Sequence, residues 1–243
     1  MFYNTQITTL PNYIFSNEEA FSKLTNIGLM FGECKKCVAS NNIDVSSGEL
    51  LTPTWVSKCP AITNINGLLL RLGTDIATLP NNYKLGASFD VLQNLHSTEC
   101  AFALMGSLIS NTDINSGFLY NSLKTLRKCK GIFANTNLSS ITEVFNGNAN
   151  GNNIETIDWG FAYTSPNPFV LPYYSRFPTK VSCKDTWFNT SKPASVDYNT
   201  WPAESKNIPA NQDSDTITGK VDNWIADNTK LLTAQVFLAK TQI

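Results

Sequence analysis

The chain has 243 residues and a formal net charge of −1, and only 15% of its residues are charged, against about 25% in an average soluble protein. Uncharged polar residues take their place, with 28 Asn, 25 Thr and 21 Ser. This balance excludes a nucleic-acid-binding protein, which needs a basic stripe, and a hydrophobic content of 42% excludes an acidic disordered chain.

The N-terminal segment, residues 1-23, is expected to form a cap. It has no basic region followed by a long apolar run, so the sequence predicts no signal peptide. Ser16, followed by Glu18 and Glu19, is a reasonable helix start, because exposed N–H groups favour oxygen atoms and negative charge. Nowhere does the chain reach about 18 consecutive apolar residues, so no membrane insertion is predicted.

Six cysteines follow along the chain, and Cys34 and Cys37 form a C-x-x-C pair. Disulfides are one possibility for an even number, but without a secretion signal free thiols are favoured. A structural zinc site needs four ligands, and the sequence has no second C-x-x-C pair and a single histidine, His96. The residues before Cys34 do not present the strand of a redox site. We therefore predict structural cysteines, with no metal and no cofactor.

From residue 24 onward, short apolar pieces alternate with turns rich in Asn, Gly and Thr, and the pieces resemble one another. Sliding the segment 126-141 back by 24 places its first thirteen residues on 102-114, with apolar residues coinciding at relative positions 1, 4, 7, 8 and 13. The same frame opens other segments, giving starts at 24, 62, 102, 126 and 154. One such unit cannot bury its own apolar face, so several must stack.

This frame resembles the BspA-type leucine-rich repeats of bacterial surface and phage proteins, whose text is L-x-x-I-x-x-h-F-x-x-(C/T)-x-L-x-x-I, with h apolar. The matching residues are Leu24/Ile27/Met30/Phe31/Cys34, Ile62/Ile65/Leu68/Leu69, Phe102/Met105/Leu108/Ile109, Leu126/Cys129/Ile132/Phe133/Leu138/Ile141 and Ile154/Ile157/Gly160/Phe161. The resemblance implies a leucine-rich-repeat-like solenoid of short strands with turns and short helices over residues 24-170. It places Cys34 at the turn position and Cys129 at an inward position. The predicted core residues are Ile27, Ile65, Leu108, Leu126, Ile132, Phe133 and Phe161.

Residues 171-243 differ in character and are predicted to form an irregular, aromatic-rich C-terminal cap or attachment region. Tyr173, Tyr174, Trp187 and Trp201 are its candidate binding residues, because tyrosine and tryptophan bury much area at low entropic cost. The tail is ambiguous. Val221, Trp224 and Leu231 have helical spacing, whereas Ala234, Val236 and Leu238 alternate like a strand.

The sequence offers few of the side-chain arrangements that catalysis needs. His96 stands beside Ser97 in sequence rather than across a fold, and no G-x-S-x-G motif exists. Carboxylates such as Glu143, Glu155, Asp158 and Asp185 have no spacing that singles them out as an acid pair. The catalytic set is therefore predicted to be empty, and the chain is predicted not to be an enzyme.

The sequence favours a non-enzymatic structural or binding protein, most of all a bacteriophage virion component such as a decoration, fibre-associated or tail-associated protein. The expected location is the virion, and the expected partners are other virion or surface proteins, with glycans and a homo-oligomeric assembly as further possibilities. A bacterial cell-surface adhesin module is the first alternative. A carbohydrate-active hydrolase with two acids beside Trp187 or Trp201 is the second.

Overall fold

A computed structural model describes residues 2–8, 22–37, 49–50, 56, 58–75, 84–85, 89, 92–105, 119, 122–136, 153–162, 177–178, 180–186, 201–205 and 214–240. Its strands β1 (Glu49–Leu50) and β2 (Lys84–Leu85) pair in parallel. The 3-10 helix η7 covers Ala203–Ser205, and the long helix α2 covers Ser214–Lys240.

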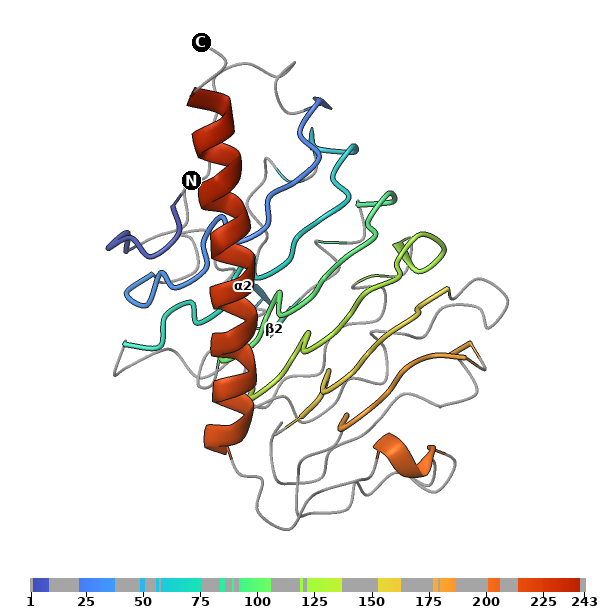
Figure 1. The fold of residues 1–243 in the computed structure, drawn as a ribbon. Coiled ribbons are helices and arrows are strands. Elements are labelled where there is room, and N and C mark those ends of the chain that lie inside the picture. Colours follow the sequence, from blue (N-terminus) through green and yellow to red (C-terminus); the bar gives the residue numbers. More distant parts are fainter. Residues whose placement is uncertain are drawn as a thin grey trace.

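Most of the remaining described residues belong to six short segments that lie side by side, which we call rungs (Figure 1). The rungs are residues 24–34, 62–72, 95–105, 126–136, 154–162 and 180–186. Single parallel bridges link each rung to the next, through Asn26, Asn64, Ser97, Lys128, Thr156 and Ser182. We number positions within each rung from its first residue, so that these bridge residues all occupy position 3.

The backbone hydrogen bonds of the rungs follow one rule. The N–H groups at positions 4, 6, 8 and 10 donate to carbonyls at positions 3, 5, 7 and 9 of the next rung, as from Ile27 to Asn64 (3.0 Å) and from Cys129 to Thr156 (2.9 Å). The N–H at position 7 instead closes a tight turn inside its own rung, as from Met30 to the Ile27 carbonyl (3.1 Å). These polar groups are thus paired, although the described residues include only two short regular strands.

Each of the first four rungs bends at two left-handed residues, at positions 6 and 10, and the described parts of the fifth and sixth rungs bend at position 6, at Trp159 and Asp185. In the second rung these are Gly67 (φ 62°) and Arg71 (φ 52°), and in the fourth they are Gly131 (φ 62°) and Asn135 (φ 51°). A positive φ at the third residue of a four-residue turn is what a type II turn requires. Glycine and asparagine tolerate it best, which explains one use of these residues in the rungs.

The third rung begins at Leu95, not at residue 102 as the sequence alignment predicted. Its Thr98 donates to Lys128 (2.8 Å) and its Phe102 donates to Ile132 (3.0 Å), so Phe102 occupies position 8. The rung starts are therefore spaced by 38, 33, 31, 28 and 26 residues. The 24-residue slide was wrong because it matched apolar residues and an Asn-Thr pair without the hydrogen-bond register.

The main core is built largely from positions 1, 4, 7, 8 and 11 of the rungs, and residues outside the rungs such as Cys59, Leu92 and Trp201 belong to it as well. Of the predicted core residues, Ile27, Ile65, Leu126, Ile132, Phe133 and Phe161 are all at most 1% exposed, which confirms these predictions. Leu108 lies outside the described residues. At position 8, the rings of Phe102 and Phe133 stack with centroids 5.5 Å apart.

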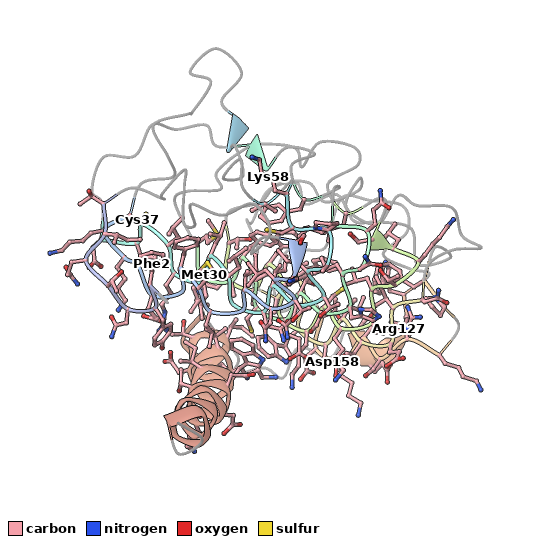
Figure 2. The ribbon with its side chains drawn as sticks, turned by 90° about the horizontal axis from the view of Figure 1, so that it is seen from above. Phe2, Met30, Cys37, Lys58, Arg127 and Asp158 are labelled. Carbon is pink, nitrogen blue, oxygen red and sulfur yellow. The ribbon has the colours of Figure 1, made fainter. Side chains whose placement is uncertain are left out.

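A second apolar cluster forms where α2 packs across the rungs (Figure 2). Ile217, Val221 and Trp224 are spaced by four and three residues, so they share one face of the helix. The same cluster holds residues at positions 6 and 9 of the rungs, among them Cys100, Ala103 and Trp159. The helical interpretation of the tail is therefore correct over the whole of α2, and its strand alternative over residues 234–238 is wrong.

Polar contacts add to this interface. Arg71 bonds both Glu33 (2.8 Å) and Asp222 of α2 (2.6 Å), and Lys220 bonds Asp185 (3.0 Å). Gly67 is needed here, because a Cβ at this residue would lie within 3.0 Å of the Trp224 ring. In Figure 1, α2 runs along the stack of rungs rather than over its end.

The predicted boundaries at 23 and 170 do not interrupt the hydrogen bonding. Phe2 donates to the Met30 carbonyl (3.0 Å), so the N-terminal segment continues the stack. At the other end, Ile157 donates to Ser182 (2.8 Å), beyond the predicted boundary at 170. The leucine-rich-repeat type of solenoid itself stays a prediction.

Candidate functional site

One face of the rungs presents the side chains of positions 3 and 5, and these side chains hold neighbouring rungs together. Asn66 Oδ1 accepts hydrogen bonds from Ser97 Oγ (2.7 Å) and the Glu99 N–H (2.8 Å) of the next rung. Asp158 Oδ1 does the same for Ser182 Oγ (2.7 Å) and the Lys184 N–H (2.8 Å). The N–H group at position 5 takes no part in the backbone hydrogen bonds between rungs. In these two cases a side-chain oxygen accepts its hydrogen bond instead.

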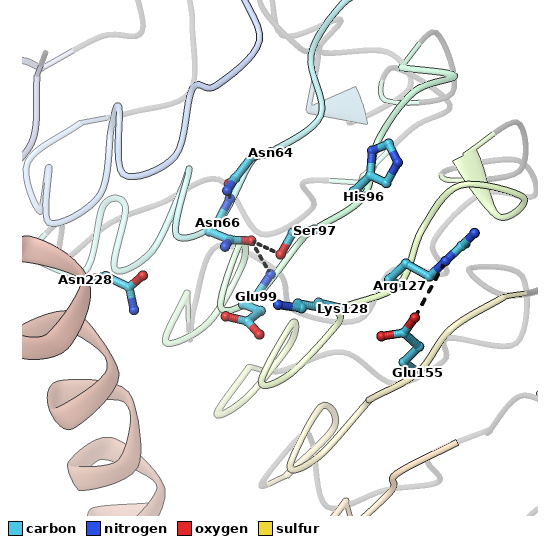
Figure 3. Close-up of a pocket in the computed structure, with 9 residues that line it drawn as sticks. All are labelled: Asn64, Asn66, His96, Ser97, Glu99, Arg127, Lys128, Glu155 and Asn228. Atoms are coloured by element: carbon cyan, nitrogen blue, oxygen red, sulfur yellow. Dashed lines mark hydrogen bonds and ion pairs between the residues drawn. The ribbon is translucent and has the colours of Figure 1, made fainter. Parts of the chain in front are cut away.

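A polar groove of about 450 Å³ lies on this face (Figure 3). Its lining residues come from four successive rungs and from α2: Asn64, Asn66, His96, Ser97, Glu99, Arg127, Lys128, Glu155 and Asn228. Since the lining residues are brought together by the rung register and by the docking of α2, the groove is a product of the tertiary structure.

The charged groups of the groove are balanced and partly engaged. Arg127 Nε lies 3.8 Å from Glu155 Oε1, and Glu99 Oε2 accepts a hydrogen bond from Trp224 Nε1 (3.2 Å). Lys128 is exposed and has no ion pair with another described residue. Among the described residues that line it, the groove thus has two carboxylates, one guanidinium and one ammonium group, with no excess of either sign.

Two of the three asparagines that line the groove, Asn64 and Asn66, have side-chain oxygens that already accept hydrogen bonds from the rungs. Asn64 Oδ1 accepts the Asn66 N–H (2.8 Å), and Asn66 Oδ1 is occupied by the third rung. Within the described part of the chain, neither Nδ2 group donates to a protein atom. Asn228 is the reverse case, because its Nδ2 donates to the Trp224 carbonyl (2.8 Å) and its oxygen stays available.

The groove does not assemble the nucleophile and base of a catalytic triad. Ser97 Oγ donates to Asn66 rather than to a base, and Figure 3 shows the His96 and Ser97 side chains pointing in different directions. A triad needs the nucleophile and its base within hydrogen-bond reach.

The carboxylates considered from the sequence do not form one cluster. Glu155 lines the groove, whereas Asp158 bridges two rungs and Asp185 pairs with Lys220 on the α2 side. Glu143 lies outside the described residues. Of the three carboxylates that the structure describes, it therefore brings Glu155 into the groove, together with Glu99, which the sequence did not single out.

Of the four aromatic residues predicted to bind a partner, Trp201 can be placed. It is 2% exposed and packs on Phe177 with ring centroids 5.4 Å apart, so it serves the core rather than an exposed contact surface. This corrects its assignment as a binding residue. Tyr173, Tyr174 and Trp187 lie outside the described residues, and their binding role stays a prediction.

All six cysteines are buried as free thiols. Cys34 Sγ donates to the Phe2 carbonyl (2.9 Å), which gives this thiol a structural role beside the N-terminal segment. Among the described residues, no three His, Cys, Asp or Glu side chains are grouped closely enough to hold a metal ion.

Burial raises the pKa of Cys37 and Cys129 to about 12, and that of Cys59 to about 11, from an ordinary value of 9.0. The unfolded chain loses these protons at lower pH than the folded chain does. We therefore expect the free energy of unfolding to fall as the pH rises above about 9, by up to about 1.4 kcal/mol per pH unit for one thiol. Chemical denaturation at a series of pH values measures this decrease.

The variant Cys129→Ala is the control for the thiol prediction, because it removes one titrating group and should give a shallower decrease. Thiol counting supplies a second check. All six thiols should react slowly with a disulfide reagent at pH 8 while the chain is folded, and rapidly in denaturant. Fast reaction of the folded chain would contradict their burial.

Comparison with protein-family models, with curated proteins and with solved structures gave no match to this chain. Among the described residues, none of the helices has the length and apolarity needed to cross a membrane.

Sequence reasoning missed Arg127, Lys128 and Asn228 as groove residues. Arg127 and Lys128 occupy positions 2 and 3, directly between the buried Leu126 and Cys129 of the fourth rung. A correct repeat alignment places positions 2 and 3 of successive rungs side by side on the exposed face. These groove residues could therefore have been predicted from the sequence. Asn228 carries no such signal, because only the docking of α2 brings it to the groove.

Proposed function

We propose that this chain is a non-enzymatic binding protein whose contact surface includes the polar groove. The observation that carries the proposal is the lining of the groove, which combines amide, hydroxyl and balanced charged groups held by four rungs and α2. Such groups recognise a polar partner through hydrogen bonds, and their orientation is set in advance by the rung-to-rung bonds of Asn66.

Contact is favoured over a reaction because the reactive side chains of the described residues serve other purposes. The buried thiols of Cys37, Cys59 and Cys129 hold their protons, so they are poor nucleophiles. Glu99 is bonded to an indole N–H, and Glu155 faces a guanidinium. The two-acid hydrolase remains the less favoured alternative, and Trp201 does not line the groove beside these glutamates.

The setting in which this binding takes place is part of the proposal. A bacteriophage virion is favoured by the neutral surface rich in Asn and Thr and by the resemblance to repeats of phage proteins, with a bacterial cell surface as the alternative. Electron microscopy of the native assembly, with the chain labelled by antibody, tests this setting. Absence of label from particles would reject the virion.

We expect the variants Lys128→Ala and Asn228→Ala to weaken association with the native assembly about tenfold, because each removes an available polar group from the groove. Cosedimentation of the purified chain with the assembly measures this loss. The matched controls are Lys184→Ala, an exposed lysine of the sixth rung, and Asn223→Ala, an exposed asparagine of α2. Both controls should associate like the wild type.

Unchanged association of both groove variants would contradict the role of the groove and would move the contact elsewhere, the aromatic region 171-201 with Tyr173, Tyr174 and Trp187 being the next candidate. Release of smaller sugars when the chain is incubated with oligosaccharides would contradict the non-enzymatic assignment.

A further inference from the structure

We infer that the ligand of the groove is a neutral oligosaccharide, lying across the second to fifth rungs and against α2. This inference rests on the proposed function and assigns the chemical class of the ligand. It follows from the length of the groove, its charge balance and the kinds of hydrogen-bonding group that it leaves available.

The length of the groove fits a chain of sugars better than a single small molecule. Its lining extends from Asn64 in the second rung to Glu155 in the fifth. Neighbouring rungs bonded like parallel strands are about 4.8 Å apart, so three intervals amount to roughly 14 Å. The volume of about 450 Å³ lies within the range of small-ligand sites, but the lining is polar where most such sites are apolar.

The charge balance selects a neutral ligand. A strongly anionic ligand would meet Glu99 and Glu155, and a strongly cationic ligand would meet Arg127 and Lys128. Like charges placed together in a contact are unfavourable, so either kind of ligand would bind against repulsion.

The hydrogen-bonding groups that the groove leaves available favour a ligand rich in hydroxyl groups. Asn64 and Asn66 offer Nδ2 donors, whereas the carboxylates of Glu99 and Glu155 and the Asn228 oxygen offer acceptors. A hydroxyl group is neutral, and it both donates and accepts. A ligand with many hydroxyls along its length therefore satisfies both sets of groups without carrying a charge.

Helix α2 completes the site through Asn228. The residue lies one helical turn after Trp224, to whose carbonyl it donates, and Trp224 in turn bonds Glu99 of the groove. Figure 3 shows Asn228 on α2 beside Glu99. The position of the Asn228 oxygen is thereby tied to the docked position of α2. An undocked α2 would leave the groove without this acceptor.

His96 provides a direct test, because it is the only histidine of the chain and it lines the groove. Its ring C–H signals in a proton NMR spectrum can be followed without any other assignment. The neutral probes are maltohexaose, cellohexaose and hexa-N-acetylchitohexaose, and the anionic probe is a heparin hexasaccharide. We expect at least one neutral probe to shift the His96 signals in a saturable way, and the anionic probe to leave them unchanged.

The variant Asn228→Ala should raise the Kd of the active neutral probe about threefold to tenfold, through the loss of one hydrogen bond. Alanine is a better helix former than asparagine, so α2 should stay intact. Asn223→Ala is the matched control, with an unchanged Kd. Binding unaffected by Asn228→Ala would overturn the placement of the ligand against α2.

The remaining outcomes separate this inference from the proposed function. Saturable shifts with heparin alone, or with none of the four probes, would overturn the neutral oligosaccharide. If Lys128→Ala still weakened cosedimentation in that case, the groove would be a contact for a protein partner. If the groove variants cosedimented normally while no probe bound, both the inference and the proposed function would be rejected.

Discussion

The variant Phe133→Ala is expected to lose about 3–5 kcal/mol of unfolding free energy, which is a large share of the stability of an ordinary domain. Phe133 is 0% exposed, and its ring stacks on that of Phe102 in the neighbouring rung at 5.5 Å. Truncation removes the buried ring and leaves a cavity between rungs that are held by backbone hydrogen bonds and cannot collapse freely. The melting temperature should fall by roughly 10 °C, as measured by circular dichroism.

Phe133→Leu is the control, because it keeps most of the buried apolar volume and should cost well below the alanine variant. The comparison isolates the cavity from any general sensitivity of the fourth rung. An unchanged melting temperature for Phe133→Ala would mean that position 8 is not packed in the core, and the rung register would then be wrong.

The second large effect is expected for Gly131→Ala, with a loss of about 2–4 kcal/mol. Gly131 has a φ of 62°, which an alanine adopts only at a cost, and a Cβ at this residue would overlap the ring of Trp159 in the next rung. Trp159 is 5% exposed and belongs to the cluster under α2. The ring must therefore move out of a packed position, and tryptophan fluorescence together with denaturant unfolding should report the change.

A double-mutant cycle separates the two causes. In a Trp159→Leu background, Gly131→Ala should cost less, because the overlap with the indole is gone and only the backbone strain remains. Gly219→Ala is the matched glycine control, since a Cβ at this residue of α2 would meet nothing within 4 Å beyond its chain neighbours and the backbone of its own helix. It should stabilise the chain by about 0.5–1 kcal/mol through helix propensity. Equal costs of Gly131→Ala in both backgrounds would contradict the contact with Trp159.

The core positions could be predicted from the sequence, because they depend on a local pattern. The spacing that aligned Phe31, Phe133 and Phe161 also placed them in the observed core. The third rung shows the limit of this approach. Many apolar residues between 95 and 114 allow more than one alignment, and the hydrogen bonds of Thr98 and Phe102 decide between them.

The place of the aromatic C-terminal part could not be predicted in the same way. Trp201 is an interface residue by composition, yet it is buried on Phe177. Trp224 belongs to a partly helical pattern, but nothing local indicates that it packs beside Gly67, more than 150 residues earlier in the chain. Such pairings depend on long-range packing between distant parts of the chain, which no local residue pattern specifies.

By itself the sequence determined the neutral polar surface, the absence of a catalytic motif, the repeated frame and most of the buried residues within it. These properties depend on composition and on spacings of a few residues, which fix which side chains can share a face. Only the tertiary structure decided the register of the rungs, the docking of α2 and the groove. The groove joins residues from Asn64 to Asn228, and the free energy that brings them together comes from long-range packing and hydrogen bonds that no single segment contains.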